Sequence, residues 1–479
     1  MPDASGNNIE SFEVFLDLKI TDMAENPITD ICVPLIIGIF GFALPMLIGI
    51  VQHIDKKYRS TRLIQLFVAE KWLRVFACSL IASLVALFAY LFILCPDALT
   101  IFMLLSCMLL VYSVCRVFYL VYIYQVPASL QQRLLKSPGM TAEKRQVWLE
   151  VFYALLERDN HEEIQKGFDA LVKWSKDTLK ENTPQTYPQE LYEAFITIHE
   201  KLCGRPRRVI PIPGGTCLLR IFFDNTKDGN GNSRLLSPET LRTFWICLHQ
   251  QLDYNRDEWF MDYWRHAHQY YDERFACGTL CDGGKTKEAQ EIEKAQKEFE
   301  EFHLALGGLL LYKQKYNLLQ QVTNYSSSVP ARYPLVPEIS GELIASFIDL
   351  FSNAPEGHIK YALKYPFLNR NSGMADDNAF INSWIQRYLV FLFYRHFTHQ
   401  YHNPNVDANA GHFRVPVEDE AWKSIWRNVS PVLRERMNAA ELQAVSAQIL
   451  RLSDEAMAKI KEDFQSELDS IDEEVGKSA

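Results

Sequence analysis

The stretch IFMLLSCMLLVYSVCRVFYLVYIY, from Ile101 to Tyr124, is 24 residues long and contains one charged side chain, Arg116. Two uncharged stretches precede it, Ile31 to Gln52 with 22 residues and Val75 to Cys95 with 21. A bilayer core of about 30 Å needs about 20 apolar residues at a helical rise of about 1.5 Å each, so each stretch can cross once. Buried helices of a soluble protein are the alternative, but three within the first 125 residues favour the membrane. The sequence therefore predicts an α-helical membrane protein with three N-terminal transmembrane helices.

The whole-chain composition hides this membrane part. The 479 residues are 48% hydrophobic and 23% charged, and the mean hydropathy of −0.11 is that of an ordinary soluble protein. Of the net charge of −10, residues 126–479 carry −8. This composition excludes a fully disordered chain, a small disulfide scaffold and a generic basic nucleic-acid-binding protein. Any nucleic acid would have to bind a local basic patch on an acidic background.

The loops between the spans predict the orientation of the chain. Basic residues crowd the first loop (Lys56, Lys57, Arg59, Arg62, Lys71 and Arg74) and follow the third span (Arg133, Lys136, Lys144 and Arg145), whereas the turn 96–100 has none. Basic loops stay on the cytoplasmic side, so the N-terminus is expected outside and the large C-terminal part inside. Residues 1–30 hold seven acidic residues and one lysine, which is not the basic start of a signal peptide.

Four parts are expected along the chain. Residues 1–30 form an extracytoplasmic tail, 31–125 the three-span membrane domain, 126–453 a mostly α-helical cytosolic sensor or gating domain, and 454–479 an acidic tail. Within the cytosolic domain, Gly204 to Ser237 differs, because prolines, paired glycines and the apolar run from Cys217 to Phe223 suggest a small β-like insert of one or two strands. The tail has nine acidic and three basic residues, and we expect it to fray.

The search for catalytic and cofactor motifs is negative. The sequence has no phosphate-binding Gly-Lys-Ser/Thr loop, dinucleotide fingerprint, His-Glu-x-x-His pair or nucleophile elbow. Asp224 to Leu235 imitates a calcium loop, but Leu235 stands where the bidentate glutamate belongs. We therefore expect no catalytic residue, no metal and no cofactor.

Two groups of histidines remain as weaker metal candidates. One is His266 and His268 with Cys277 and Cys281, and the other is His396, His399 and His402. Histidines two positions apart point to opposite sides of a helix, and those three apart drift around it. Core packing and helix-end positions are the favoured interpretations.

Two residues of the spans are candidates for an intramembrane role. Pro45 lies inside the first span, where proline removes a hydrogen bond and bends a helix, although membrane helices often tolerate it. Arg116 lies about two-thirds of the way through the third span. A charge at that depth faces a protein interior or a water path and finds a partner there. Snorkelling of the long side chain to the inner headgroups is the alternative.

The candidate ligand site is a basic cluster in the insert. Arg205, Arg207 and Arg208 lie within four positions around Pro206, and Arg220, Lys227 and Arg234 follow within thirty residues. Guanidinium groups match phosphate oxygens bidentately, so the cluster predicts an anion site. Phe222 and Phe223 offer aromatic faces for stacking unpaired bases. A solvated basic turn that pairs with the acidic tail or with lipid headgroups is the alternative.

Three further stretches carry a resemblance to a known class. They are Phe302–Tyr316 (FHLALGGLLLYKQKY), Val329–Pro337 (VPARYPLVP) and Ser383–Leu389 (SWIQRYL). Together with few spans and a large cytosolic domain, they resemble membrane proteins of bacterial anti-phage defence operons, in particular the channel-like transmembrane effector of Hailong-type systems. The resemblance implies a homo-oligomeric channel of the bacterial inner membrane, held shut by DNA oligomers from a partner nucleotidyltransferase encoded in the same operon. None of the stretches is a site motif, so no residue role is carried over.

Three functions follow as hypotheses. The first is a ligand-gated pore, because three short-looped spans suit a symmetric ring of subunits, for example a tetramer, surrounded by membrane lipid. The ligand would be a nucleotide or a single-stranded DNA oligomer. The second is a membrane-anchored scaffold, and the third is an enzyme whose site has no recognisable motif.

Overall fold

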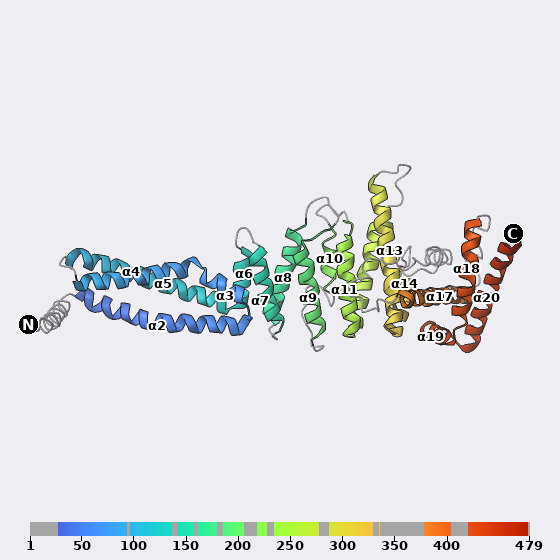
Figure 1. The fold of residues 1–479 in the computed structure, drawn as a ribbon, viewed down its shortest axis with the longest axis horizontal. Coiled ribbons are helices and arrows are strands. Elements are labelled where there is room, and N and C mark those ends of the chain that lie inside the picture. The colour runs from blue at the N-terminus through green and yellow to red at the C-terminus, as the bar shows by residue number, and fades with distance from the viewer. Residues whose placement is uncertain are drawn as a thin grey trace, which may run out of the picture. The chain divides into compact units, whose positions relative to one another are not determined.

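The computed structural model describes residues 27–92, 96–136, 142–157, 161–179, 185–205, 218–227, 234–276, 287–328, 335, 378–403 and 420–477. Every regular element in these residues is a helix, and an isolated parallel bridge joins Gln185 to Leu236. The predicted α-helical fold class, with three N-terminal helices long enough to span a membrane, is confirmed (Figure 1). The chain divides into two compact units, residues 1–170 and 171–479, with the boundary inside helix α8 (His161–Asp177).

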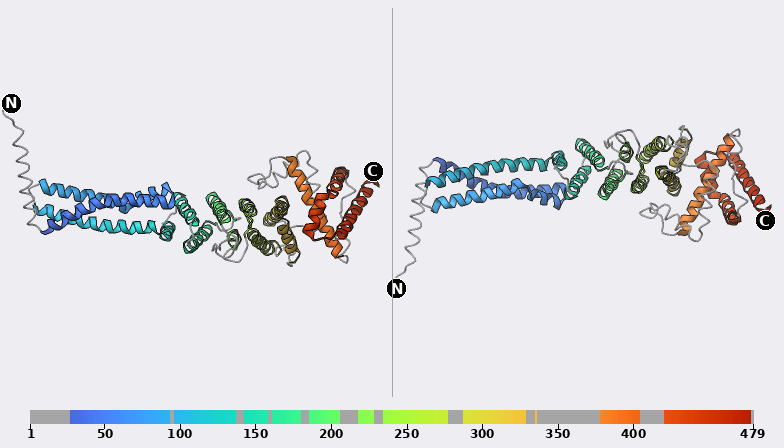
Figure 2. Two further views of the ribbon diagram at one scale, coloured as in Figure 1. Left: turned by 90° about the horizontal axis from the view of Figure 1, so that it is seen from below. Right: turned by 90° about the horizontal axis from the view of Figure 1, so that it is seen from above.

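The first unit contains the three predicted membrane helices. These are α2 (Pro27–Tyr58), α4 (Lys71–Phe92) and α5 (Pro96–Gln125), which lie side by side in Figures 1 and 2. Their apolar segments Ile31–Tyr58, Lys71–Ala89 and Thr100–Gln125 have mean hydropathies of 2.5, 2.0 and 2.2. Among the described residues, all the exposed large hydrophobic side chains except Tyr254 and Tyr401 lie between Ile31 and Tyr122. Exposed apolar surface of this extent indicates contact with lipid, so the chain is a membrane protein.

The two later membrane helices pack closely through small polar residues. The hydroxyls of Ser79 on α4 and Ser113 on α5 share a hydrogen bond of 2.9 Å, and both side chains are buried. Ser83 and Ser106 are buried as well. Small residues let helices approach closely in lipid, and hydrogen bonds between helices hold them there. The serines of this sequence therefore account for the tight α4–α5 pair.

Short helices cover one end of this bundle. Helix α3 (Thr61–Val68) begins at Ser60, whose Oγ accepts a hydrogen bond of 3.0 Å from the backbone N–H of Leu63. Phe67 of α3 is buried, with its ring centre 5.0 Å from that of Tyr124 at the end of α5. Helices α6 (Pro127–Lys136) and α7 (Ala142–Leu156) follow α5 at the same end of the bundle (Figure 1).

The second unit is built around an aromatic core. Phe222 is fully buried, and the centres of the rings of Tyr187, Tyr192, Phe195 and Phe244 lie 4.5–6.2 Å from its own. The helices of this region are α9 (Gln189–Cys203), α10 (Arg220–Asp224), α11 (Pro238–Asp253), α12 (Asp257–Tyr271), the π-helix η1 (Asp272–Ala276), α13 (Lys287–Tyr312) and α14 (Tyr316–Ser328).

The expected strand in the insert is wrong where the structure describes that segment. Arg220–Asp224 is helix α10, and Ile221, Phe222 and Phe223 are all buried within it. A short continuous apolar run suits a buried helix as well as a buried strand, and here helices surround it on several sides. Residues 206–217 and 228–233 of the insert lie outside the described residues.

The expectation that the acidic tail frays is also wrong. Residues Asp454–Lys477 form helix α20, which packs with α17 (Asn378–His402), α18 (Glu420–Met437) and α19 (Ala440–Leu450). The buried side chains of α20 recur every three or four residues: Met457, Ile460, Phe464, Leu468, Ile471 and Val475. This period puts them on one face, and burial of that face outweighs the repulsion among the acidic residues.

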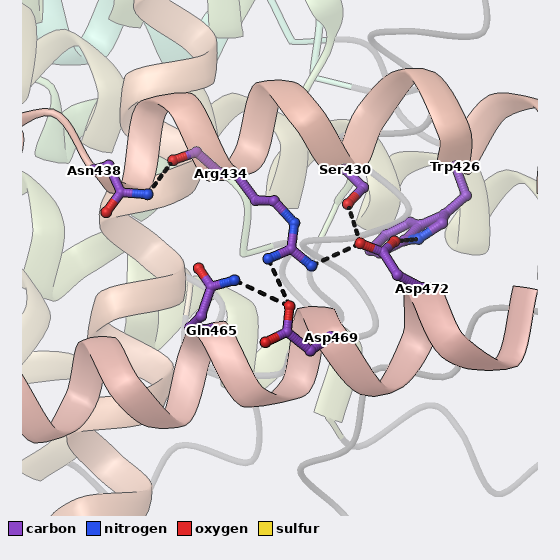
Figure 3. A network of polar contacts seen from close by, with 7 residues as sticks. All are labelled: Trp426, Ser430, Arg434, Asn438, Gln465, Asp469 and Asp472. Carbon is purple, nitrogen blue, oxygen red and sulfur yellow. Dashed lines mark hydrogen bonds and ion pairs between the residues drawn. The ribbon is translucent and has the colours of Figure 1, made fainter. Parts of the chain in front are cut away.

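An ion-pair network fastens α20 to α18 (Figure 3). The carboxylate of Asp472 accepts hydrogen bonds from Trp426 Nε1 at 2.7 Å, Ser430 Oγ at 2.9 Å and Arg434 Nη2 at 2.6 Å. Arg434 Nη1 also lies 2.7 Å from Oδ1 of Asp469. Two acidic residues of the tail are thus engaged within the fold.

Candidate functional site

One face of α2 combines small side chains with exposure. Pro34, Gly38, Gly41, Pro45 and Gly49 are all exposed and follow one another at intervals of four, three, four and four residues. At about 100° per residue this spacing keeps them on one side of the helix. A Cβ placed on Gly38, Gly41 or Gly49 would meet no atom within 4 Å. The structure therefore places the predicted residue Pro45 in an open face along α2, which we call the Pro/Gly face.

Arg116 has aromatic partners at one end of the bundle. Its Nε donates a hydrogen bond of 2.9 Å to the hydroxyl of Tyr112, and its guanidinium lies 4.9 Å from the ring centre of Trp72. Trp72 belongs to the first turn of α4, beside Lys71 and Arg74. The side chain thus reaches toward the basic end of the bundle, an arrangement that favours the snorkelling interpretation.

A polar junction joins the membrane helices to α6 and α7. Glu70, between α3 and α4, accepts hydrogen bonds of 3.0 and 2.9 Å from Arg133 of α6 and one of 3.1 Å from the hydroxyl of Tyr124. Glu150 of α7 accepts a hydrogen bond from Ser60 and pairs with Arg62 at 3.4 Å. Two carboxylates therefore bind α6 and α7 to the ends of α3.

This junction is not predicted by the sequence patterns above. Glu70 is one of three acidic residues between Ile31 and Gln125, and that scarcity was a signal that it has a specific partner. Its partner Arg133 lies 63 positions away, and nothing in the local sequence points to it.

The structure brings two of the predicted basic side chains, those of Arg220 and Lys227, to one helix face. Lys227 pairs with Glu273 at 3.1 Å, and the carbonyl of Arg234 accepts a hydrogen bond of 3.2 Å from Tyr270. Arg220 is close enough to His266 to lower the pKa of that imidazole, a smaller influence than the lowering by burial and the raising by Asp262. His266, Tyr270 and Glu273 recur at intervals of four and three along α12 and η1. The side chains of Arg220 and Lys227 therefore border the same edge of this helix, whereas Arg234 contacts it through its backbone carbonyl and has its charged group near Tyr187.

Acidic side chains accompany these cations. Arg220 Nε lies 3.4 Å from Asp224, and Lys227 is bound to Glu273. Arg205 is half-buried, and Arg207 and Arg208 lie outside the described residues.

Arg256 holds the backbone at the start of the insert, a role that the sequence does not predict. Its guanidinium donates hydrogen bonds of 3.2 and 2.8 Å to the carbonyl of Cys203 and a further one to the carbonyl of Arg205. The chain therefore leaves α9 in a defined direction.

The aromatic part of the predicted ligand site is wrong. Phe222 is 0% exposed and Phe223 6%, and both rings pack against neighbouring aromatic rings of the core. A ring buried on both faces has no surface left for a nucleic-acid base. Their position among the basic residues of the insert predicts exposed rings, whereas helix α10 packs both rings into the core.

The buried histidines of the second unit have partners that suit neutral imidazoles. His199 donates from Nδ1 to Gln250 at 2.9 Å and accepts from Gln251 at Nε2, also at 2.9 Å. His303 donates from Nδ1 to the carbonyl of Phe299 at 2.8 Å and accepts from the hydroxyl of Tyr263 at 3.1 Å. Burial lowers the pKa of His199 to about 4 and that of His303 to about 3. These contacts are structural.

The metal candidates gain no geometric support. Within the described ranges, no three histidine, cysteine or acidic side chains gather closely enough to hold a metal ion. His268 is buried beside Trp264, whereas His266 is half-buried, and Cys277 and Cys281 lie outside the described residues. His396 is buried, and His399 and His402 are exposed.

Comparison of the chain with protein-family models, with curated proteins and with solved structures finds no match. The membrane helices, the polar junction and the basic residues of the insert are therefore the features that point to a function.

Proposed function

We propose that this chain is one subunit of a homo-oligomeric membrane pore that a ligand controls through the C-terminal part. The observation that carries the proposal is the Pro/Gly face of α2. Such small-residue faces allow helices to approach closely within a bilayer, where apolar burial alone gives little association. Three spans are too few to enclose a conduit by themselves, so a pore needs several copies arranged around an axis.

The polar junction gives the proposal a route between ligand and pore. Glu150 and Glu70 hold α7 and α6 against α3 and the start of α4. A movement of α6 or α7 therefore acts on the membrane helices through charge-assisted hydrogen bonds, which are stronger than neutral ones.

The biological setting of the proposal follows from the resemblance to anti-phage effectors. The proposed pore lies in the bacterial inner membrane, and each subunit has its N-terminus outside and its C-terminal part in the cytoplasm. A single-stranded DNA oligomer from a nucleotidyltransferase is the controlling ligand, and Arg205, Arg207 and Arg208 are its main phosphate contacts. Arg220, Lys227 and Arg234 extend this contact only weakly, because Asp224 and Glu273 already neutralise two of these three cations. The chain itself has no catalytic role.

The test of the pore combines oligomer size with membrane potential. Gly41→Leu adds bulk to the Pro/Gly face, whereas Ala77→Leu adds nearly the same bulk to an exposed position of α4. We expect Gly41→Leu to reduce the oligomer seen by chemical crosslinking and to abolish depolarisation of expressing cells, measured with a potential-sensitive dye. Ala77→Leu should leave both unchanged.

Two results would contradict the proposal. If both variants form the wild-type oligomer and depolarise cells equally, the Pro/Gly face is not the subunit contact. If the wild-type protein assembles but never alters the membrane potential, with or without single-stranded oligonucleotide, a scaffold is the better interpretation.

The proposed orientation is tested by labelling with an impermeant thiol reagent in intact cells. Ala98→Cys, in the first turn of α5, should react, and Thr61→Cys should not. Thr61 is exposed, whereas the adjacent Ser60 is buried and caps α3, which makes it unsuitable for a cysteine. Labelling of Thr61→Cys but not Ala98→Cys would reverse the orientation. A background without the native cysteines keeps the signal specific.

A further inference from the structure

A cavity of about 740 Å³ lies at the end of the membrane bundle where α3, α4, α5, α6 and α7 meet. Its lining includes Glu70, Lys71, Tyr119, Tyr122, Arg133 and Lys144. All of these residues belong to the first unit. The cavity adjoins the polar junction, since Glu70 and Arg133 are part of both.

The charged lining is positive. Lys71, Arg133 and Lys144 face one carboxylate, that of Glu70, so the formal charge of the lining is +2. Arg133 holds both oxygens of Glu70, and Tyr124 holds one of them as well. This engagement fixes the acidic side chain within a lining whose formal charge is positive.

The other walls are apolar and aromatic. Leu66, Ile123, Leu130 and Leu134 contribute aliphatic surface. Tyr119 and Tyr122, in the last two turns of α5, are 59% and 58% exposed and belong to the apolar outer surface of the bundle. Tyrosines with an apolar ring and a polar hydroxyl are typical of the level where acyl chains end and headgroups begin.

We propose that this cavity binds the headgroup of an anionic phospholipid. Its phosphodiester would contact Lys71 and Lys144, with Arg133 behind them, and the start of its acyl chains would lie along Tyr119 and Tyr122. Basic pockets between membrane helices at the charged loop end are suited to such headgroups. A bound lipid would then connect α4 and α5 with α6 and α7, next to the ion pair that already joins them.

The test uses the full chain, purified in detergent and titrated with phosphatidylglycerol or phosphatidylcholine, with bound lipid counted by native mass spectrometry. We expect tighter retention of phosphatidylglycerol. Each of Lys71→Gln and Lys144→Gln should weaken it about fivefold, the effect of losing one cation near a headgroup. Lys56→Gln is the matched control, because Lys56 is an exposed lysine of the same basic layer at the end of α2, outside the cavity.

Three results would overturn the proposal, each in a different way. If the wild type retains the two lipids equally, the cavity does not select an anionic headgroup. Equal losses in Lys56→Gln and Lys71→Gln would mean that the basic layer attracts lipid generally and that the cavity is not a site. Displacement of phosphatidylglycerol by millimolar inorganic phosphate would assign the cavity to a soluble anion.

Discussion

The guanidinium of Arg116 on α5 lies 4.9 Å from the ring centre of Trp72 on α4, and the ring centre of Tyr112 lies 5.3 Å from the same group. The charged side chain therefore has partners from two membrane helices. Tyr112 precedes Arg116 by four positions, which puts both on one side of α5. Trp72 lies in the first turn of α4, at the end that carries the basic loop. These contacts indicate an anchor at the membrane surface.

The first prediction follows from this anchor. A cation over an aromatic ring is worth about 1 kcal/mol at a partly exposed site. In a double-mutant cycle, Arg116→Leu and Trp72→Leu should show a coupling of about that size in the thermal stability of the detergent-solubilised protein. Arg116→Lys should keep most of it.

The same variants decide between the anchor and a pore-lining role. An anchor predicts that Arg116→Leu depolarises cells as the wild type does once expression is matched. A changed ion selectivity or current in Arg116→Leu, with no coupling to Trp72, would indicate that Arg116 lines the pore.

A second prediction concerns the docking of α20. Asp472 is the common acceptor for Trp426, Ser430 and Arg434 (Figure 3). Asp472→Ala leaves three partly buried donors without their acceptor, so we expect a loss of about 2–4 kcal/mol in the stability of the C-terminal helices. Limited proteolysis should then remove α20 at a protease concentration that spares the wild type.

A neighbouring acidic residue gives the control for that change. Glu462 is exposed and pairs with Lys459 on its own helix, so Glu462→Ala should alter stability by less than about 0.5 kcal/mol. Equal protease sensitivity in the two variants would mean that net charge, and not the Asp472 contacts, controls the docking.

The sequence predicted the spans well because a membrane helix is defined by composition and length. Helix α5 runs from Pro96 to Gln125, beyond the predicted span Ile101–Tyr124 at both ends, since polar residues can continue a helix beyond the hydrocarbon. The predictions of a strand in the insert and of a fraying tail were wrong for a different reason. Phe222 stands in an apolar run too short to distinguish a strand from a helix, and Phe464 is the one aromatic residue of an acidic stretch. The burial of both rings depends on helices that are distant in the chain. The Glu70–Arg133 pair was unpredictable for the same reason.

A third prediction is that the second unit loses stability in mild acid. The pKa of His199 falls to about 4 and that of His303 to about 3 through burial, against about 6.5 in an unfolded chain. Between these values the unfolded state binds more protons than the folded state, so stability rises with pH across this window and is complete above about 6.5. Each histidine should cost on the order of 3 kcal/mol as the pH falls from 6.5 toward its folded pKa.

The measurement is unfolding of the full chain at several pH values, followed by tryptophan fluorescence. His303→Gln should flatten the curve between about pH 6.5 and 4, because carboxylates titrate mainly below that range. His402→Gln is the control, since His402 is exposed at the end of α17. An unchanged slope in His303→Gln would mean that His303 is protonated in the folded protein, and its contact with Tyr263 would need another account.

The last prediction concerns the proposed ligand. A short single-stranded oligonucleotide should bind the full chain with strong salt dependence, because each phosphate that is neutralised releases about 0.7 counterion. If Arg205, Arg207 and Arg208 each contact a phosphate, their joint replacement by glutamine should lower the slope of log affinity against log salt by about 2.

Arg220→Gln with Lys227→Gln is the control, because Asp224 and Glu273 already accompany these cations and the expected change is small. The buried rings of Phe222 and Phe223 cannot stack on bases, so binding should show little preference among base sequences. A strong effect of the control pair would move the contact to the α12 edge, and absence of binding by the wild type would remove nucleic acid from the proposed function.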